Sequence, residues 1–221
     1  MPRRLRPTAP IAPDAVLVGD PGRALLLAQE LLEEPKMSNH ARGLWGYSGR
    51  TPGGKPLTIQ ATGIGGPSAV LVLSDLVELG VRRAVRVGTC VGLDATFAPG
   101  DLLVVAEAIA RGGSVVAVGV AMGEPVPPDP ELTRRLKEEL GEQAHAAVVS
   151  SYDLYPGEQS LPGGPVDMQS APLLARARSL GVEAAALLIV TETAAGSQLG
   201  KEEIERAEKL AGRAASASLS S

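Results

Sequence analysis

Arg86 lies within an apolar run that ends in the small residues Gly88-Thr89-Cys90. Such a run predicts a buried strand, and a helix that ends near Gly80 precedes it. A buried arginine is costly unless a negative group meets it. Because ligands bind at the carboxyl ends of strands in open α/β sheets, Arg86 and the following glycines indicate an anion site.

Two further glycine turns follow apolar strands. Gly19-Asp20-Pro21-Gly22-Arg23 comes directly before a helical segment, and Thr62-Gly63-Ile64-Gly65-Gly66-Pro67-Ser68 opens another. The free N–H groups at a helix start, together with an arginine, suit a bound phosphate. One such turn is more often only a tight turn. Three of them in the first hundred residues favour a phosphate or nucleotide-like ligand.

The chain has 221 residues, 44% of them hydrophobic, and a net charge of −4. This composition suits one globular domain and argues against a nucleic-acid groove or an anionic membrane surface. The single cysteine, Cys90, excludes an internal disulfide, fits the reducing cytoplasm and is interpreted as a small buried filler. No metal-ligand spacing is present, so we expect no metal and no organic cofactor.

The pattern of elements predicts an α/β fold. We expect a single three-layer α/β/α domain over residues 13–221 with a central mixed sheet, after a loosely held, basic arm at 1–12. Asp129 and Pro130 have the types expected at a helix start. Strands are predicted at 15–19, 44–48, 56–61, 84–88, 101–108, 114–119, 145–151 and 184–190, and helices at 22–33, 66–80, 129–141, 169–180 and 200–216.

Four motifs carry a family resemblance. Gly19-Asp20-Pro21-x-Arg23, Arg42 to Gly49, Thr62 to Ser68 and Arg86-Val87-Gly88-Thr89 occur in the order and spacing of the nucleoside phosphorylase family. The chain is similar to the branch that holds hexameric purine nucleoside phosphorylases and uridine phosphorylases, from about residue 15 to about 215. The first half matches closely, and the second half departs at several positions.

The resemblance assigns a phosphate site. It implies that Gly19, Arg23, Arg86 and Thr89 surround the phosphate, with Arg86 also among the catalytic residues. It also implies that Arg42 reaches in from a neighbouring subunit, so that the active sites of a homo-oligomer, expected to be a trimer of dimers, are shared across a dimer interface. Without the resemblance, Arg42 would be interpreted as a solvated surface residue.

The expected sugar site departs from the family. Met168 and Gln169 resemble the segment in which a methionine packs on the ribose and a glutamate accepts from its hydroxyls. An amide cannot match the charge-assisted bonds of a carboxylate. If this departure weakens the enzyme, restored turnover in a Gln169→Glu variant would show that the lost carboxylate matters. The N-terminal histidine usual in the family is also missing, since the chain has only His40 and His145.

The resemblance places the base near Tyr155, Glu158 and Glu192. Tyr155 could stack on a base. Glu158 stands where the uridine branch has a glutamine, and Glu192 where the purine branch has a catalytic aspartate. Glu192 would act as a general acid, and Arg206 resembles the arginine that pairs with that acid. The base, purine or uridine-type, stays open.

Three functions remain as alternatives. The first is phosphate-dependent cleavage of a nucleoside to its base and (deoxy)ribose 1-phosphate, with phosphate as co-substrate. The second is a hydrolytic nucleosidase, which would not need the arginines. The third is a weakened or non-catalytic nucleoside or phosphate binder, which Gln169 and the missing histidine would explain.

Overall fold

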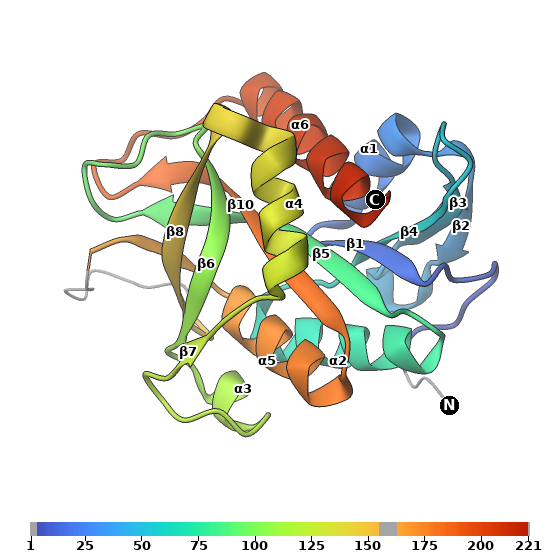
Figure 1. Cartoon of the computed structure of the whole chain (residues 1–221), viewed down its shortest axis with the longest axis horizontal. Helices are drawn as coiled ribbons and strands as arrows, with labels where there is room; N and C mark the ends of the chain where they lie inside the picture. Colours follow the sequence, from blue (N-terminus) through green and yellow to red (C-terminus); the bar gives the residue numbers. More distant parts are fainter. Residues whose placement is uncertain (1–3, 155–162, 221) are drawn as a thin grey trace.

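The computed structural model describes residues 4–154 and 163–220. Strands and helices alternate along most of the chain (Figure 1). The strands are β1 (Asp14–Val18), β2 (Glu33–Asn39), β3 (Gly46–Arg50), β4 (Pro56–Ala61), β5 (Arg83–Gly92), β6 (Leu102–Ala110), β7 (Pro125–Val126), β8 (Ala144–Ser151), β9 (Pro165–Asp167) and β10 (Glu183–Thr193). The α-helices are α1 (Pro21–Leu31), α2 (Gly65–Glu78), α3 (Gly113–Val116), α4 (Pro130–Leu140), α5 (Ser170–Leu180) and α6 (Lys201–Ser220).

The strands form one mixed sheet. Strand β5 lies at its centre and pairs in parallel with β1 and with β10, while β4 pairs in parallel with β1. The pairs β5–β10, β10–β6, β6–β8, β8–β9 and β9–β5 close a ring of strands on one side. On the other side the sheet stays open and ends at β2. Because β1, β4, β5 and β10 are parallel, their carboxyl ends meet at one edge of the sheet.

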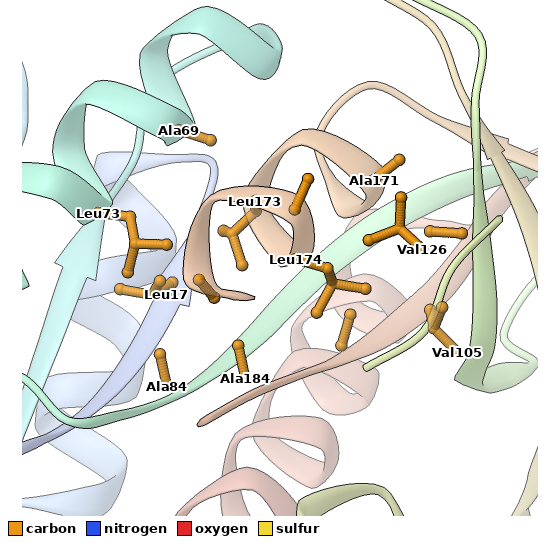
Figure 2. Packing of buried hydrophobic residues seen from close by; sticks show 14 of the residues in the cluster. Leu17, Ala69, Leu73, Ala84, Val105, Val126, Ala171, Leu173, Leu174 and Ala184 are labelled. Atoms are coloured by element: carbon orange, nitrogen blue, oxygen red, sulfur yellow. The ribbon is translucent and has the colours of Figure 1, made fainter. Parts of the chain in front are cut away.

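Helices cover both faces of the sheet, which confirms the predicted three-layer α/β/α architecture (Figure 1). The alternation within β1 shows the two faces: Leu17 packs in one core cluster, and Val16 packs in the other. In the first cluster α2 and α5 lie on the sheet, with Leu73 and Leu174 among the packed side chains (Figure 2). The second cluster packs under α1, α4 and α6.

Five of the predicted helices are confirmed within a few residues at each end. The Asp129 side chain caps α4 as expected, because it accepts from the N–H groups of Glu131 and Leu132 at 3.0 and 2.9 Å. The predicted strand at 114–119 is wrong, since this segment contains α3. The carboxylate of Asp153 accepts from the N–H and hydroxyl groups of Ser114, so a contact distant in sequence stabilises the helical turn.

The N-terminal segment is not loosely held over residues 4–12. Leu5 is buried in the first core cluster, and its N–H donates to Asp75 at 3.0 Å. Arg4 forms an ion pair with the same carboxylate. The N–H of Thr8 donates to Ser38 O in the edge strand β2, and the N–H of Ala12 donates to Thr58 Oγ1 in β4. Among the described residues, no helix is long and apolar enough to cross a membrane.

Candidate active site

A cavity of about 370 Å³ opens at the edge where the parallel strands end. It lies against the loops after β1 and β4, the second half of β5, the end of β10, and the segment from β9 to α5. The described residues that line it are Gly19, Asp20, Pro21, Arg23, Gly63, Ile64, Gly65, Arg86, Gly88, Thr89, Cys90, Val91, Val166, Asp167, Met168, Gln169 and Thr191. The structure thus brings together the three glycine turns and the predicted sugar segment.

Arg86 forms the floor of the cavity, and all three of its guanidinium nitrogens have protein partners. Nη2 donates to Asp167 at 3.1 Å and Nη1 donates to the Gln169 amide oxygen at 2.7 Å. Nε donates to the Ser170 hydroxyl at 3.4 Å. The side chain is 5% exposed and that of Asp167 is fully buried. The negative group that a buried arginine requires is therefore supplied by the protein itself.

The Asp167 carboxylate accepts hydrogen bonds from several residues of the cavity floor. Its Oδ1 accepts from the Ser151 hydroxyl at 2.5 Å. Its Oδ2 accepts from the N–H and hydroxyl groups of Ser170, at 2.9 and 2.7 Å, as well as from Arg86. Burial is the largest influence on Arg86 and lowers its pKa, while the charge and hydrogen bond of Asp167 act in the opposite direction. The guanidinium keeps its charge, because arginine titrates far above neutral pH.

Gly88 makes room for this arrangement. A Cβ atom at position 88 would lie 2.4 Å from Cζ of Arg86. The arginine therefore occupies the space beside the strand that any other residue at position 88 would fill. This steric requirement explains why a glycine stands two residues after Arg86 within β5.

Gln169 uses its amide within the protein. Oε1 accepts from Arg86 and lies 3.1 Å from the Thr62 hydroxyl, while Nε2 donates to the carbonyl oxygens of Gly63 and Gly65 at 2.6 and 3.1 Å. Gly63 and Gly65 have φ angles of 74° and 78°, which favour glycine. An amide satisfies both sides, because it accepts from an arginine and donates to two carbonyls.

Arg23 is held differently from Arg86. Its N–H donates to Oδ1 of Asp20, the residue that caps α1, at 2.9 Å. Its Nε donates to Glu208 on α6 at 2.5 Å. The side chains of Arg23 and Glu208 are 11% and 10% exposed. Arg23 thus lines the cavity with one edge of its guanidinium engaged by the protein.

Cys90 also lines the cavity, at a position where its thiol is inert. Burial is the main cause that raises the pKa of Cys90, and the charge of Asp167 adds to the rise. The thiol is therefore protonated at neutral pH and supplies no nucleophile. Thr89 and Met168 also line the cavity.

The residues expected at the base lie in different places. A bulge interrupts the pairing of β10 with β5 between Val190 and Glu192. As a result Thr191 lines the cavity, whereas Glu192 is half-buried and does not. Arg206 is exposed on α6 and does not line the cavity either. Tyr155 and Glu158 lie outside the described residues.

Arg42 lies outside this cavity and next to it. It is exposed and has a φ angle of 60°, a conformation that costs a non-glycine residue free energy. Arg42 lines a second hollow that shares Ile64, Gly65 and Met168 with the cavity. Within its own chain, Arg42 therefore belongs to the surface beside the cavity and not to the cavity itself.

The sequence placed Asp167 in the expected sugar segment and Thr191 in the strand end expected at the base, but gave neither residue a role of its own, and it did not single out Glu208. Asp167 could have been found as the nearest carboxylate to the predicted sugar segment. Thr191 depends on the β10 bulge, which leaves no signal in the sequence. Glu208 is 185 positions from its partner Arg23 and falls on a helix rich in charged residues.

The fold and the site define an α/β protein with two arginines in a cavity at the carboxyl edge of its sheet. The family model of the Phosphorylase superfamily matches residues 13–220. The chain therefore belongs to the Phosphorylase superfamily.

Individual relatives agree with this assignment. A DeoD-type purine nucleoside phosphorylase of Oceanobacillus iheyensis is 43% identical over 81 residues, which are 36% of this chain and 34% of the relative. One of Clostridium beijerinckii is 37% identical over 103 residues, 46% of this chain and 43% of the relative. The matches thus span less than half of these relatives.

A solved structure shares the fold. The purine nucleoside phosphorylase of Toxoplasma gondii, in complex with immucillin-H, has a TM-score of 0.84 at 20% identity and covers 95% of this chain and 91% of its own. This likeness confirms the fold class over nearly the whole chain.

Proposed function

We propose that the chain is a phosphate-dependent nucleoside phosphorylase that acts on purine nucleosides. The observation that carries the proposal is the convergence of Gly19, Arg23, Arg86 and Thr89 with Met168 at one cavity. The relatives named above are purine nucleoside phosphorylases, which supports a purine over a uridine-type base.

In the proposed reaction an oxygen of phosphate bonds to the anomeric carbon as the bond from that carbon to the base nitrogen breaks. The base takes up a proton, and the products are free base and (deoxy)ribose 1-phosphate. The guanidinium of Arg23 would hold the phosphate beside Gly19 and Thr89. Met168 would pack against the sugar. Positioning and charge stabilisation would supply most of the rate enhancement.

Base release with and without phosphate tests this proposal. The purified protein is incubated with inosine, guanosine, adenosine, methylthioadenosine, uridine and thymidine, and the products are separated by chromatography. We expect release from a purine nucleoside only when phosphate is present, together with a pentose 1-phosphate. Equal release without phosphate would instead favour a hydrolytic nucleosidase.

Two observations favour a second candidate, a nucleoside or phosphate binder with weak or no turnover. The Gln169 amide is committed to Arg86 and to two backbone carbonyls, so no carboxylate faces a sugar there. Glu192 does not line the cavity. Calorimetric binding of a nucleoside or of phosphate, combined with no base release from any substrate, would support this candidate.

We further propose that two copies of the chain share each site. Ile64 and Leu154 are 85% and 81% exposed, and both line the hollow beside Arg42. If a second copy of the chain covers this apolar surface, Arg42 of the first copy would reach the cavity of the second. Neighbouring apolar side chains that stay exposed are typical of protein interfaces.

Mixing two inactive variants tests the shared site. In a mixed pair of Arg42→Ala and Arg23→Ala chains, one of the two sites keeps both arginines if Arg42 comes from the partner. We therefore expect mixing to recover base release that neither variant shows alone. No recovery, under conditions where mixed pairs form, would mean that Arg42 does not act across the interface.

A further inference from the structure

Helices α1 and α6 pack against each other, and an ion pair between them involves Arg23, which lines the cavity. Gly212 allows the helices to approach closely, since a Cβ atom there would lie 2.6 Å from Cδ2 of Leu27. One turn earlier on α6, Glu208 accepts from Nε of Arg23 at 2.5 Å. Glu208 is 8% exposed and does not line the cavity. Its contact with the site therefore runs through Arg23.

The ion pair leaves one edge of Arg23 for a ligand. A guanidinium binds anions through two adjacent N–H groups, either on the Nε side or between the two Nη atoms. Glu208 occupies the Nε side, and Asp20 fixes the backbone of the same residue. Within the described part of the chain, the hydrogen bonds of Arg23 run to Asp20 and Glu208 and none involves its Nη atoms. Because Arg23 lines the cavity, the Nη atoms are the groups left to meet an anion there.

The charges of the site show why the Nη edge of Arg23 matters for phosphate binding. The charge of Arg23 lowers the pKa of Arg86, so the two guanidinium groups act on each other across the cavity. Asp167, Gln169 and Ser170 take three of the five N–H groups of Arg86, one on each nitrogen. Arg23 keeps the N–H groups of both Nη atoms and can therefore offer a phosphate in the cavity a complete edge of paired, charge-assisted donors.

We propose that Glu208 is a positioning residue for phosphate. Its carboxylate accepts from Nε of Arg23 and holds the Nη edge of the guanidinium toward the cavity. This inference rests on the proposed phosphate site, and it assigns a role in that site to the last helix of the fold.

The test compares three variants in the full-length protein, with inorganic phosphate as the probe. Glu208→Ala removes the acceptor, and we expect the Kd for phosphate to rise about tenfold, as for the loss of a hydrogen bond to a charged group. Glu208→Gln keeps an oxygen that can accept from Nε and should bind phosphate within about twofold of the unmodified protein. The Kd values are measured by titration calorimetry.

Glu30→Gln is the matched control. Arg213 pairs with Glu30 at 2.6 Å and joins the same two helices at an exposed place away from the cavity. We expect this variant to bind phosphate as the unmodified protein does. A rise in Kd for Glu30→Gln equal to that for Glu208→Ala would mean that general loosening of the helix pair, and not the position of Arg23, is responsible.

The outcomes separate this inference from the proposed function. If the unmodified protein binds phosphate and Glu208→Ala binds it equally well, the role of Glu208 is wrong while the phosphate site stands. The role is also wrong if Glu208→Gln binds as weakly as Glu208→Ala. If the unmodified protein binds no phosphate, the proposed site and the role of Glu208 fail together.

Discussion

The two arginines of the cavity are bound by the protein to different degrees: Arg86 on its floor, and Arg23 on its rim at the start of α1. On the floor, Arg86 has a protein partner for each nitrogen and is 5% exposed. On the rim, Arg23 has a single side-chain partner, Glu208, at its Nε. The comparison teaches that two arginines lining one cavity have different tasks. Arg86 holds strand β5 to the start of α5, and Arg23 keeps both of its Nη groups for a ligand.

Removal of the charge of Asp167 should destabilise the floor of the cavity and cause the largest loss in the free energy of unfolding. Asp167→Asn leaves the buried Arg86 without a counter-charge, and the loss of one partner of a buried pair costs about 3–5 kcal/mol. We expect a decrease of that size in the free energy of unfolding, measured with urea. Glu30→Gln, which affects an exposed pair, should change it by less than about 0.5 kcal/mol. Equal stabilities of the two variants would refute the structural role of the floor.

A glutamate at position 169 tests whether the amide belongs to the floor. In Gln169→Glu a carboxylate oxygen would replace the donor that now faces the carbonyls of Gly63 and Gly65, at 2.6 and 3.1 Å. The loss of the amide donor to both carbonyls should cost about 1–3 kcal/mol of unfolding free energy.

The same variant tests the alternative of a weakened enzyme that was drawn from the sequence. Under that alternative, the carboxylate would restore turnover. From the contacts of Gln169, we expect no gain in phosphate-dependent base release. Faster release by Gln169→Glu, with unchanged stability, would show that the Gly63–Gly65 loop can give up its hydrogen bonds to this side chain.

A change at Arg23 should affect the fold less than a change on the floor. Arg23→Gln keeps an amide that can donate to Glu208 but removes the counter-charge of this carboxylate, so we expect the free energy of unfolding to fall by about 1–3 kcal/mol. Phosphate binding should weaken about tenfold or more, because the paired charged donors are lost. Urea unfolding and calorimetry on the same sample measure the two effects. A destabilisation as large as that of Asp167→Asn would mean that the rim is as structural as the floor.

Alkylation of Cys90 should show the smallest effect. Burial raises the pKa of this thiol, so the reactive thiolate is scarce at neutral pH and forms only in alkaline solution. We expect slow labelling of the folded protein by iodoacetamide and rapid labelling in urea, followed by mass spectrometry. Because the chain has one cysteine, the signal is unambiguous. Rapid labelling of the folded protein at neutral pH would mean that water reaches the floor.

Much of the fold could be predicted from local patterns. The helices α1, α2, α4, α5 and α6 follow from apolar periodicity and from local start signals, such as Asp129 before α4. The short strands β7 and β9 were not predicted, because two or three residues carry no period. Strand β2 was not predicted either, because most of its residues are polar and exposed. The segment at 114–119 was assigned to the wrong class, because its conformation depends on Asp153, 39 positions away from Ser114.

The site divides in the same way. Arg86 was identified as a buried charge from its apolar neighbours alone, and the glycine turns were placed at the correct edge of the sheet. The position of Glu192 was not predictable, since a single bulged residue in β10 decides which side chain lines the cavity. The roles assigned to Glu192, Arg206, Tyr155 and Glu158 stay predictions.

The sequence by itself determined which groups need partners: a buried arginine, glycines with room beside them, and an arginine at a helix start. Only the tertiary structure decided who the partners are. Arg86 is joined to Asp167 over 81 positions and Arg23 to Glu208 over 185. The physical reason is that burial and charge are properties of one residue, whereas a hydrogen bond depends on which strands and helices become neighbours. The same sheet that buries Arg86 beside Asp167 leaves Arg23 at the cavity.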